Sequence, residues 1–343
     1  MSNFEIIIEL NKSIFSTNLY KPVVYFERDG EIFEDDIEFQ DNLIIATGSR
    51  SSKIGQKGIL ETKKSTYYSL IVKGLLFVYF ECKKSFEIDR IIVRIDNIET
   101  EEYEKGEITQ VFSKDPSTEI ENKRHSLDIK CSKMFSNNKK ISDLMMISLM
   151  NLTLSYYDSN SSFDYVWKCF NALIREAFNK SRDFEMLKAL WDDLEKSEDK
   201  YGNILSFASN IDIDYLRDCF LRDMINNEQK RKPDKLAELF EGFEDYRVCT
   251  VLQDLKDNKE LIESERYSDI TSSYEYSIDN MIEKSVDVVR LVVLKYAYYL
   301  RCAYFHAEEK PSNFLIKNKS SYELNRISYP LSLMCKDLLE NKF

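Results

Sequence analysis

Residues 163–178 read F-D-Y-V-W-K-C-F-N-A-L-I-R-E-A-F and set the character of the second half of the chain. Large apolar side chains recur there at helical spacing and share one face: Phe163, Trp167, Phe170, Ile174 and Phe178. Ser161 and Ser162 precede this stripe and supply an N-cap. The width of the stripe predicts a core helix, in which the amide of Asn171 needs a hydrogen-bond partner if it is buried.

The same periodicity continues on both sides of this helix. Apolar residues at helical spacing predict further helices at 141–157, 184–196, 213–227, 234–243, 246–257, 274–306 and 330–339. Pro330 stands in the first turn of the last of them, where proline is tolerated. The second half is therefore predicted to be all-α.

The first 135 residues have a different texture. Six of the eight glycines fall before residue 107, and short β-branched or aromatic runs predict strands at 4–10, 22–26, 43–47, 67–81 and 90–97. The run 71–80 is interpreted as a strand with a bend at Gly74. The acidic segment Glu31–Glu38 holds five carboxylates without EF-hand spacing, which favours a solvated edge or loop over a calcium site.

The fold class predicted from these patterns is α+β, with two domains in 343 residues. A β-rich sensing or recruitment domain, a small sandwich or barrel, covers residues 1–135. A lysine- and asparagine-rich linker follows at 131–140, C-S-K-M-F-S-N-N-K-K. An α-helical bundle covers residues 141–343.

Composition narrows the classes of protein. The 21 Phe and 21 Tyr exclude disorder as the main state, and a net charge of −12 excludes a generally basic nucleic-acid coat. Seven scattered cysteines without C-x-x-C spacing are typical of reduced thiols in the cytoplasm. Two histidines leave almost no material for a zinc site, and no phosphate-binding glycine loop occurs, so no metal or cofactor is predicted. Charges interrupt the most apolar stretch, 286–300, so no membrane span is expected.

The segment 300–310, L-R-C-A-Y-F-H-A-E-E-K, carries the candidate chemistry. Arg301 offers a planar, permanently charged fork for phosphate oxygens, and His306 can exchange a proton near neutral pH. The two groups suffice for RNA cleavage without a metal. A base deprotonates the ribose 2′-OH, which attacks the adjacent phosphate, and the arginine stabilises the charge that develops.

Charge and geometry extend this site. Seven Lys or Arg against three Glu between residues 290 and 326 give +4 within a chain of −12. Arg290 and Lys310 are therefore predicted to contact the RNA backbone, although a solvated helix face would carry the same charges. On an ideal helix Arg301 and His306 lie about 140° apart. A two-fold homodimer would bring two copies of each into one cleft.

The helix F-x-x-x-W-x-x-F-N-A-L at 163–173, followed later by L-R-C-A-Y-F-H at 300–306, resembles the HEPN domain family and in particular its Apea-like branch. The family motif R-x-x-x-x-H closes a late core helix, and Arg301 and His306 match it. The resemblance covers residues 140–343. It implies a helical bundle, homodimerisation and metal-independent endoribonuclease activity in toxin–antitoxin, abortive-infection or other antiviral systems. Cys302 departs from the Asn, Asp or His that often follows the arginine, and a thiol hydrogen-bonds weakly.

Two functions follow as hypotheses. In the first, the chain is a cytoplasmic, dimeric endoribonuclease that cleaves RNA such as tRNA, with Arg301 on the scissile phosphate and His306 as general acid and base. An inhibitor or a phage-derived trigger would be its further partner. In the second, the helical domain is a non-catalytic dimerisation module that serves a ligand- or protein-binding β domain. There one of the two residues pairs with an acid and the other caps a helix.

Overall fold

The computed structural model describes residues 2–14, 22–28, 31–50, 58–114, 131–219, 224, 241–257, 273–305 and 322–343. The chain divides into two compact units, Met1–Ser159 with Phe343, and Asn160–Lys342. The first begins with an antiparallel sheet and the second is helical, so the predicted α+β class is confirmed.

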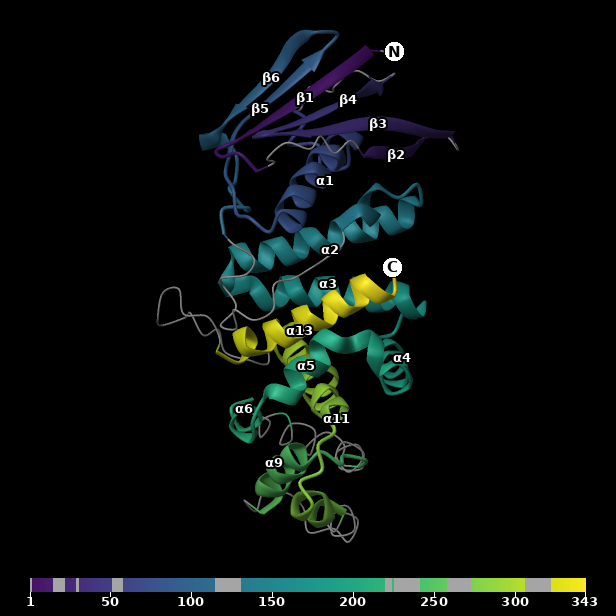
Figure 1. Cartoon of the computed structure of the whole chain (residues 1–343), viewed down its shortest axis with the longest axis vertical. Helices are drawn as coiled ribbons and strands as arrows, with labels where there is room; N and C mark the ends of the chain where they lie inside the picture. The colour runs from purple at the N-terminus through teal and green to yellow at the C-terminus, as the bar shows by residue number, and fades with distance from the viewer. Residues whose placement is uncertain are drawn as a thin grey trace. The chain divides into compact units, whose positions relative to one another are not determined.

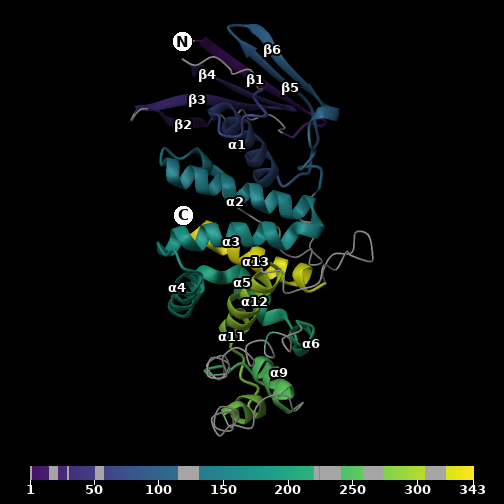
Figure 2. The same cartoon turned by 180° about the vertical axis from the view of Figure 1, so that it is seen from behind.

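Among its described residues, the first unit has a sheet of six strands, all antiparallel to their neighbours, in the order β2-β3-β4-β1-β5-β6 (Figure 1). The strands are β1 (Ser2–Leu10), β2 (Val23–Arg28), β3 (Glu31–Gln40), β4 (Leu43–Arg50), β5 (Ile88–Ile95) and β6 (Ile98–Glu104). One face carries helix α1 (Thr66–Glu81), and the core lies between them (Figures 1 and 2). The β-rich half is thus one open sheet under a helix, and not the sandwich or barrel that we expected.

Helix α1 replaces the strand predicted at 67–81, and that prediction is wrong. Every side chain from Leu70 to Phe80 is buried, so no polar face marks a period of 3.6 residues. Ser65 caps the helix by accepting a hydrogen bond from the Tyr68 amide at 3.0 Å. Gly74 is not a bend. It lets the helix approach the sheet, because a Cβ there would lie 3.1 Å from Ile44.

The acidic segment at 31–38 is strand β3 rather than an edge or loop. Asp35, Ile37 and Phe39 alternate into the core. The carboxylate of Asp35 is buried because Arg50 on β4 donates two hydrogen bonds to it, at 2.6 and 2.5 Å. A buried partner on the neighbouring strand thus explains the carboxylate that looked solvated.

Helix α2 (Lys139–Tyr157) belongs to the first unit, together with the 3-10 turn η2 (Cys131–Phe135). The ammonium of Lys73 on α1 donates to Ser142 Oγ at 2.7 Å, and that hydroxyl donates to the Met134 carbonyl at 2.5 Å. The first half of the stretch 131–140, the turn η2, is therefore packed inside the first unit, and the division between the units comes after Ser159.

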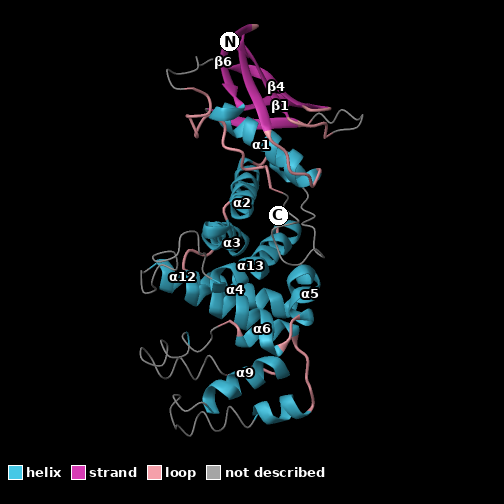
Figure 3. Ribbon diagram, turned by 90° about the vertical axis from the view of Figure 1, so that its left-hand side faces the viewer, coloured by secondary structure: helices cyan, strands magenta, loops and turns pink. Residues whose placement is uncertain are grey.

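The second unit is built from helices (Figure 3). They are α3 (Ser162–Phe178), α4 (Asp183–Lys196), α5 (Gly202–Asn210), α6 (Ile213–Arg217), α9 (Tyr246–Asp257), α11 (Ser285–Val289), α12 (Ala297–Phe305) and α13 (Tyr322–Asn341), with a 3-10 turn η4 (Glu198–Tyr201). The stripe of α3 is buried as predicted from Phe163 to Ile174, whereas Phe178 is half-buried, and α13 runs beside this helix (Figures 1 and 2). The predicted helix at 234–243 and the end of that at 213–227 lie mostly outside the described residues.

The helix predicted at 274–306 is interrupted. A helical turn at 273–279 ends where Met281 adopts a φ of 49°, and a second run begins at Ser285. This run consists of α11, the π-helical segment η5 (Arg290–Tyr296) and α12. The Ala297 amide donates to the Val292 carbonyl, five residues earlier.

Helix α13 begins at Tyr322, so Pro330 lies inside the helix and the start predicted at that residue is wrong. A proline in this place leaves the carbonyl four residues earlier without its N–H partner. The hydroxyl of Tyr215 donates to that carbonyl, Arg326 O, at 3.0 Å. A side chain from α6 thus replaces the hydrogen bond that the proline removes.

Candidate functional site

Arg301 lies on the half-buried side of helix α12. Leu300 and Ala303 beside it are buried, whereas 27% of the Arg301 side chain is exposed. Its Nη1 lies 3.7 Å from a carboxylate oxygen of Asp183, the first residue of α4, and donates to Cys302 Sγ at 3.9 Å. The guanidinium is therefore held at the start of α4, close to solvent.

Tyr298 lies one helical turn before Arg301 on α12. Its ring centroid is 6.3 Å from that of Trp167 on α3. Burial and the neighbouring Cys302 thiol raise the pKa of Tyr298 to about 12. The phenol is therefore neutral at physiological pH, and Arg301 supplies the positive charge of the site.

Two of the predicted site residues, His306 and Lys310, lie outside the described residues. The last described residue of α12 is Phe305. The pairing of Arg301 with His306 accordingly stays a prediction.

Arg290, the other predicted RNA contact, is packed between two rings. Its guanidinium carbon lies 4.7 Å from the ring centroid of Phe243 and 4.9 Å from that of Trp191. Its Nη1 donates to the Gly242 carbonyl at 3.2 Å. Cation–π contacts of this kind stabilise packing. Arg290 and Arg301 both contact α4, but the geometry favours a packing role for Arg290 and leaves Arg301 better placed for a ligand.

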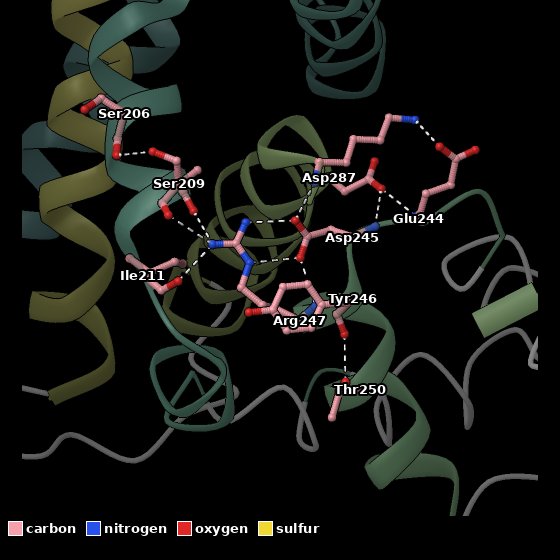
Figure 4. Close-up of polar contacts among 11 residues, drawn as sticks. Ser206, Ser209, Ile211, Glu244, Asp245, Tyr246, Arg247, Thr250 and Asp287 are labelled. Carbon is pink, nitrogen blue, oxygen red and sulfur yellow. Dashed lines mark hydrogen bonds and ion pairs between the residues drawn. The ribbon is translucent and has the colours of Figure 1, made fainter. Parts of the chain in front are cut away.

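A second polar cluster, absent from the sequence predictions, surrounds Arg247 on α9 (Figure 4). Its guanidinium donates to both carboxylate oxygens of Asp245, at 3.0 and 2.8 Å. Nη1 donates to the carbonyls of Ala208 and Ile211, at 2.8 and 2.9 Å, where α5 ends. The side chains of Arg247 and Asp245 are 3% and 0% exposed, which closes this pair to a substrate.

Asp287 on α11 completes the Arg247 cluster. One carboxylate oxygen accepts hydrogen bonds from the amides of Glu244 and Asp245, at 2.6 and 3.1 Å. The other oxygen is buried and has no hydrogen-bond partner among the described residues. Burial raises the pKa of Asp287 above its ordinary value. The cluster joins the ends of α5, α9 and α11, and its function is structural.

Asn171 on α3 was expected to need a partner if buried. Its side-chain oxygen is buried, and within the described ranges it accepts no hydrogen bond. In the same ranges, no group of three or more His, Cys, Asp or Glu side chains is placed to hold a metal ion. A search of the described helices found none with the length and apolarity needed to cross a membrane.

Comparison with known proteins identifies no relative. No family model, no curated protein and no solved structure matches the chain.

Proposed function

We propose that this chain is a metal-independent endoribonuclease that acts as a cytoplasmic homodimer. Its helical unit carries the site, and its sheet unit senses, recruits or restrains. Arg301 binds the scissile phosphate, and His306 is the general acid and base. A toxin or anti-phage role, with an inhibitor or a phage-derived trigger, follows from the resemblance to HEPN domains.

The observation that supports this proposal is the setting of Arg301. The side chain is about a quarter exposed on α12, where Ala297, Leu300 and Ala303 are buried. Its contact with Asp183 spans 3.7 Å, whereas Arg247 and Arg50 each donate two hydrogen bonds of 3.0 Å or less to a buried carboxylate. A phosphate can displace a long, half-buried ion pair at lower cost than a buried bidentate pair, because breaking a buried pair costs about 3–5 kcal/mol.

The proposed reaction needs a group that first takes and then returns a proton, and a positive charge that stabilises the phosphorane. The imidazole takes the proton of the ribose 2′-OH, and the 2′-oxygen attacks phosphorus while Arg301 stabilises the charge on the phosphorane. The bond to the 5′-oxygen breaks, and an imidazolium returns a proton to that oxygen. The products are a 2′,3′-cyclic phosphate and a 5′-hydroxyl. Because Arg301 and His306 diverge by about 140° on an ideal helix, two copies are proposed to complete one site.

The Arg301–Asp183 contact also favours a second candidate function, a non-catalytic dimerisation or binding module. In that case Asp183 is the structural partner of Arg301 and not a group that phosphate displaces. The sheet unit would then carry the ligand- or protein-binding surface.

The test uses the purified chain with EDTA, tRNA and total RNA. Arg301→Ala and His306→Ala are expected to lower the cleavage rate at least about 100-fold, the loss typical of one group that stabilises transition-state charge. Arg217→Ala is the matched control, because Arg217 is also a surface arginine paired with an aspartate, and should cleave like the wild type. Full cleavage by the His306→Ala protein would overturn the proposal.

Asp183→Asn separates the two candidates. In a ribonuclease the substitution removes the competitor for phosphate, so RNA binds more tightly and the melting temperature hardly changes. In a structural module the substitution leaves RNA binding unchanged and lowers the melting temperature as much as Arg301→Ala does.

A further inference from the structure

Phe184, the second residue of α4, has the most exposed large apolar side chain among the described residues, at 74%. It follows Asp183, whose carboxylate contacts Arg301. Burial of a phenylalanine ring stabilises a folded protein, and Phe184 leaves this stabilisation unused on the helix that contacts Arg301.

Phe184 shares one flank of α4 with Trp191. At 100° per residue, Phe184 is about 20° around the helix from Trp191, which contacts Arg290. Seven residues at 1.5 Å each separate the two positions by about 10 Å along the axis. The exposed Lys188 lies between them in sequence. Phe184 thus follows Asp183, the contact of Arg301, and shares its flank of α4 with Lys188 and with the ring that contacts Arg290.

We propose that Phe184 stacks on an unpaired base beside the phosphate bound by Arg301, so that single-stranded RNA is the substrate of the proposed ribonuclease. The inference rests on the proposed function for the position of that phosphate. Proteins that bind single strands combine cations for the backbone with aromatic rings on which bases stack. The faces of bases inside a duplex are already stacked on one another, so a paired strand has no free base face that could stack on Phe184.

The charged residues around Phe184 argue against burial of this ring in a contact between two copies of the chain. Arg182 is 83% exposed, Glu185 is 44% exposed, and Lys188 is exposed. The centre of a protein–protein interface is depleted of such residues, whereas a lone ring among charges fits a single base.

The test measures binding and cleavage separately. Binding uses a short unpaired RNA that carries 2-aminopurine, whose emission falls when it stacks, and 2′-O-methyl groups that prevent cleavage. The wild type should quench the probe. Phe184→Ala should abolish the quench and weaken binding about tenfold, in line with the loss of one stacked base. Phe184→Trp should restore both.

Tyr276→Ala is the matched control, because Tyr276 is 68% exposed elsewhere in the second unit, and it should bind like the wild type. Equal binding by the Phe184→Ala and wild-type proteins would overturn the inference. Equal binding of paired and unpaired strands by the wild type would also overturn it. So would a Phe184→Ala protein that changes its oligomeric state and binds the RNA as the wild type does. Cleavage of the unmodified strand tests the proposed function. A quench that depends on Phe184 without cleavage refutes the nuclease, and cleavage that does not depend on Phe184 refutes the stacking.

Discussion

At the scale of single residues, four arginines of this chain occupy different settings. Arg50 and Arg247 are buried in bidentate pairs, and Arg290 lies between two rings. Arg301 meets Asp183 at 3.7 Å, close to solvent. If a guanidinium leaves the buried carboxylate that it neutralises, that carboxylate stays buried without a partner, which strongly destabilises the fold. Of these four, Arg301 is therefore the one best placed to receive a phosphate.

Asp287 provides a prediction about pH. Burial raises its pKa above the ordinary value of 3.8, so the folded chain binds this proton more readily than the unfolded chain does. The free energy of unfolding should therefore rise as the pH falls through the raised pKa toward 3.8, by about 1.4 kcal/mol for each pH unit between the two pKa values. Asp287→Asn should lose this rise.

Urea denaturation at several pH values measures it, and the difference between variant and wild type isolates Asp287 from the other buried carboxyls. Asp254→Asn is the control, because Asp254 is about half exposed and pairs with Arg217 at the surface. If the free energy of unfolding of Asp287→Asn depends on pH in the same way as that of the wild type, the assignment to Asp287 is wrong.

At the scale of elements, α1 and α13 are two helices whose local sequence patterns predicted something else, a strand at 67–81 and a helix start at Pro330. Helix α1 is apolar on all sides because the sheet and α2 both cover it. Helix α13 continues through Pro330 because Tyr215 satisfies the carbonyl that the proline frees. In both helices a tertiary contact supplies what the local sequence lacks.

A double-mutant cycle tests the role of Tyr215. Tyr215→Phe keeps the ring and removes the hydroxyl, so it should lower the free energy of unfolding by about 1 kcal/mol. In a Pro330→Ala background the cost should shrink, because the new Ala amide can donate to Arg326 O. Thermal or urea unfolding of the four proteins gives the coupling. Equal costs of Tyr215→Phe in both backgrounds would show that the hydroxyl does not serve this carbonyl.

At the scale of the whole molecule, each unit has a core of its own, and α2 belongs to the first. A fragment of residues 1–159 should therefore fold and unfold cooperatively, whereas one of residues 1–138 should not. The shorter fragment ends before α2 and removes Ser142, the partner of the buried Lys73 ammonium. A buried charge without a partner is strongly destabilising, by about 3–5 kcal/mol.

Circular dichroism during heating distinguishes the two fragments. A Lys73→Met variant of the shorter fragment controls for the loss of this one partner, since the remaining difference then measures the packing of α2. Cooperative unfolding of the 1–138 fragment at the temperature of the 1–159 fragment would place the division where the composition changes, near residue 135.

The sequence by itself determined the α+β class, four of the six described strands and the aromatic helix α3, because period and turn residues are local properties of a chain. The pairing of Arg301 with His306 stays a prediction. Tertiary structure alone decided the character of α1 and β3, the place of the division between the units, and the burial of Asp245, Arg247 and Asp287. The physical reason is that these features depend on partners far away in the sequence. Whether such a segment is a strand or a helix, and whether a charge is buried, depends on the elements that pack against it, and the local sequence does not show which elements these are.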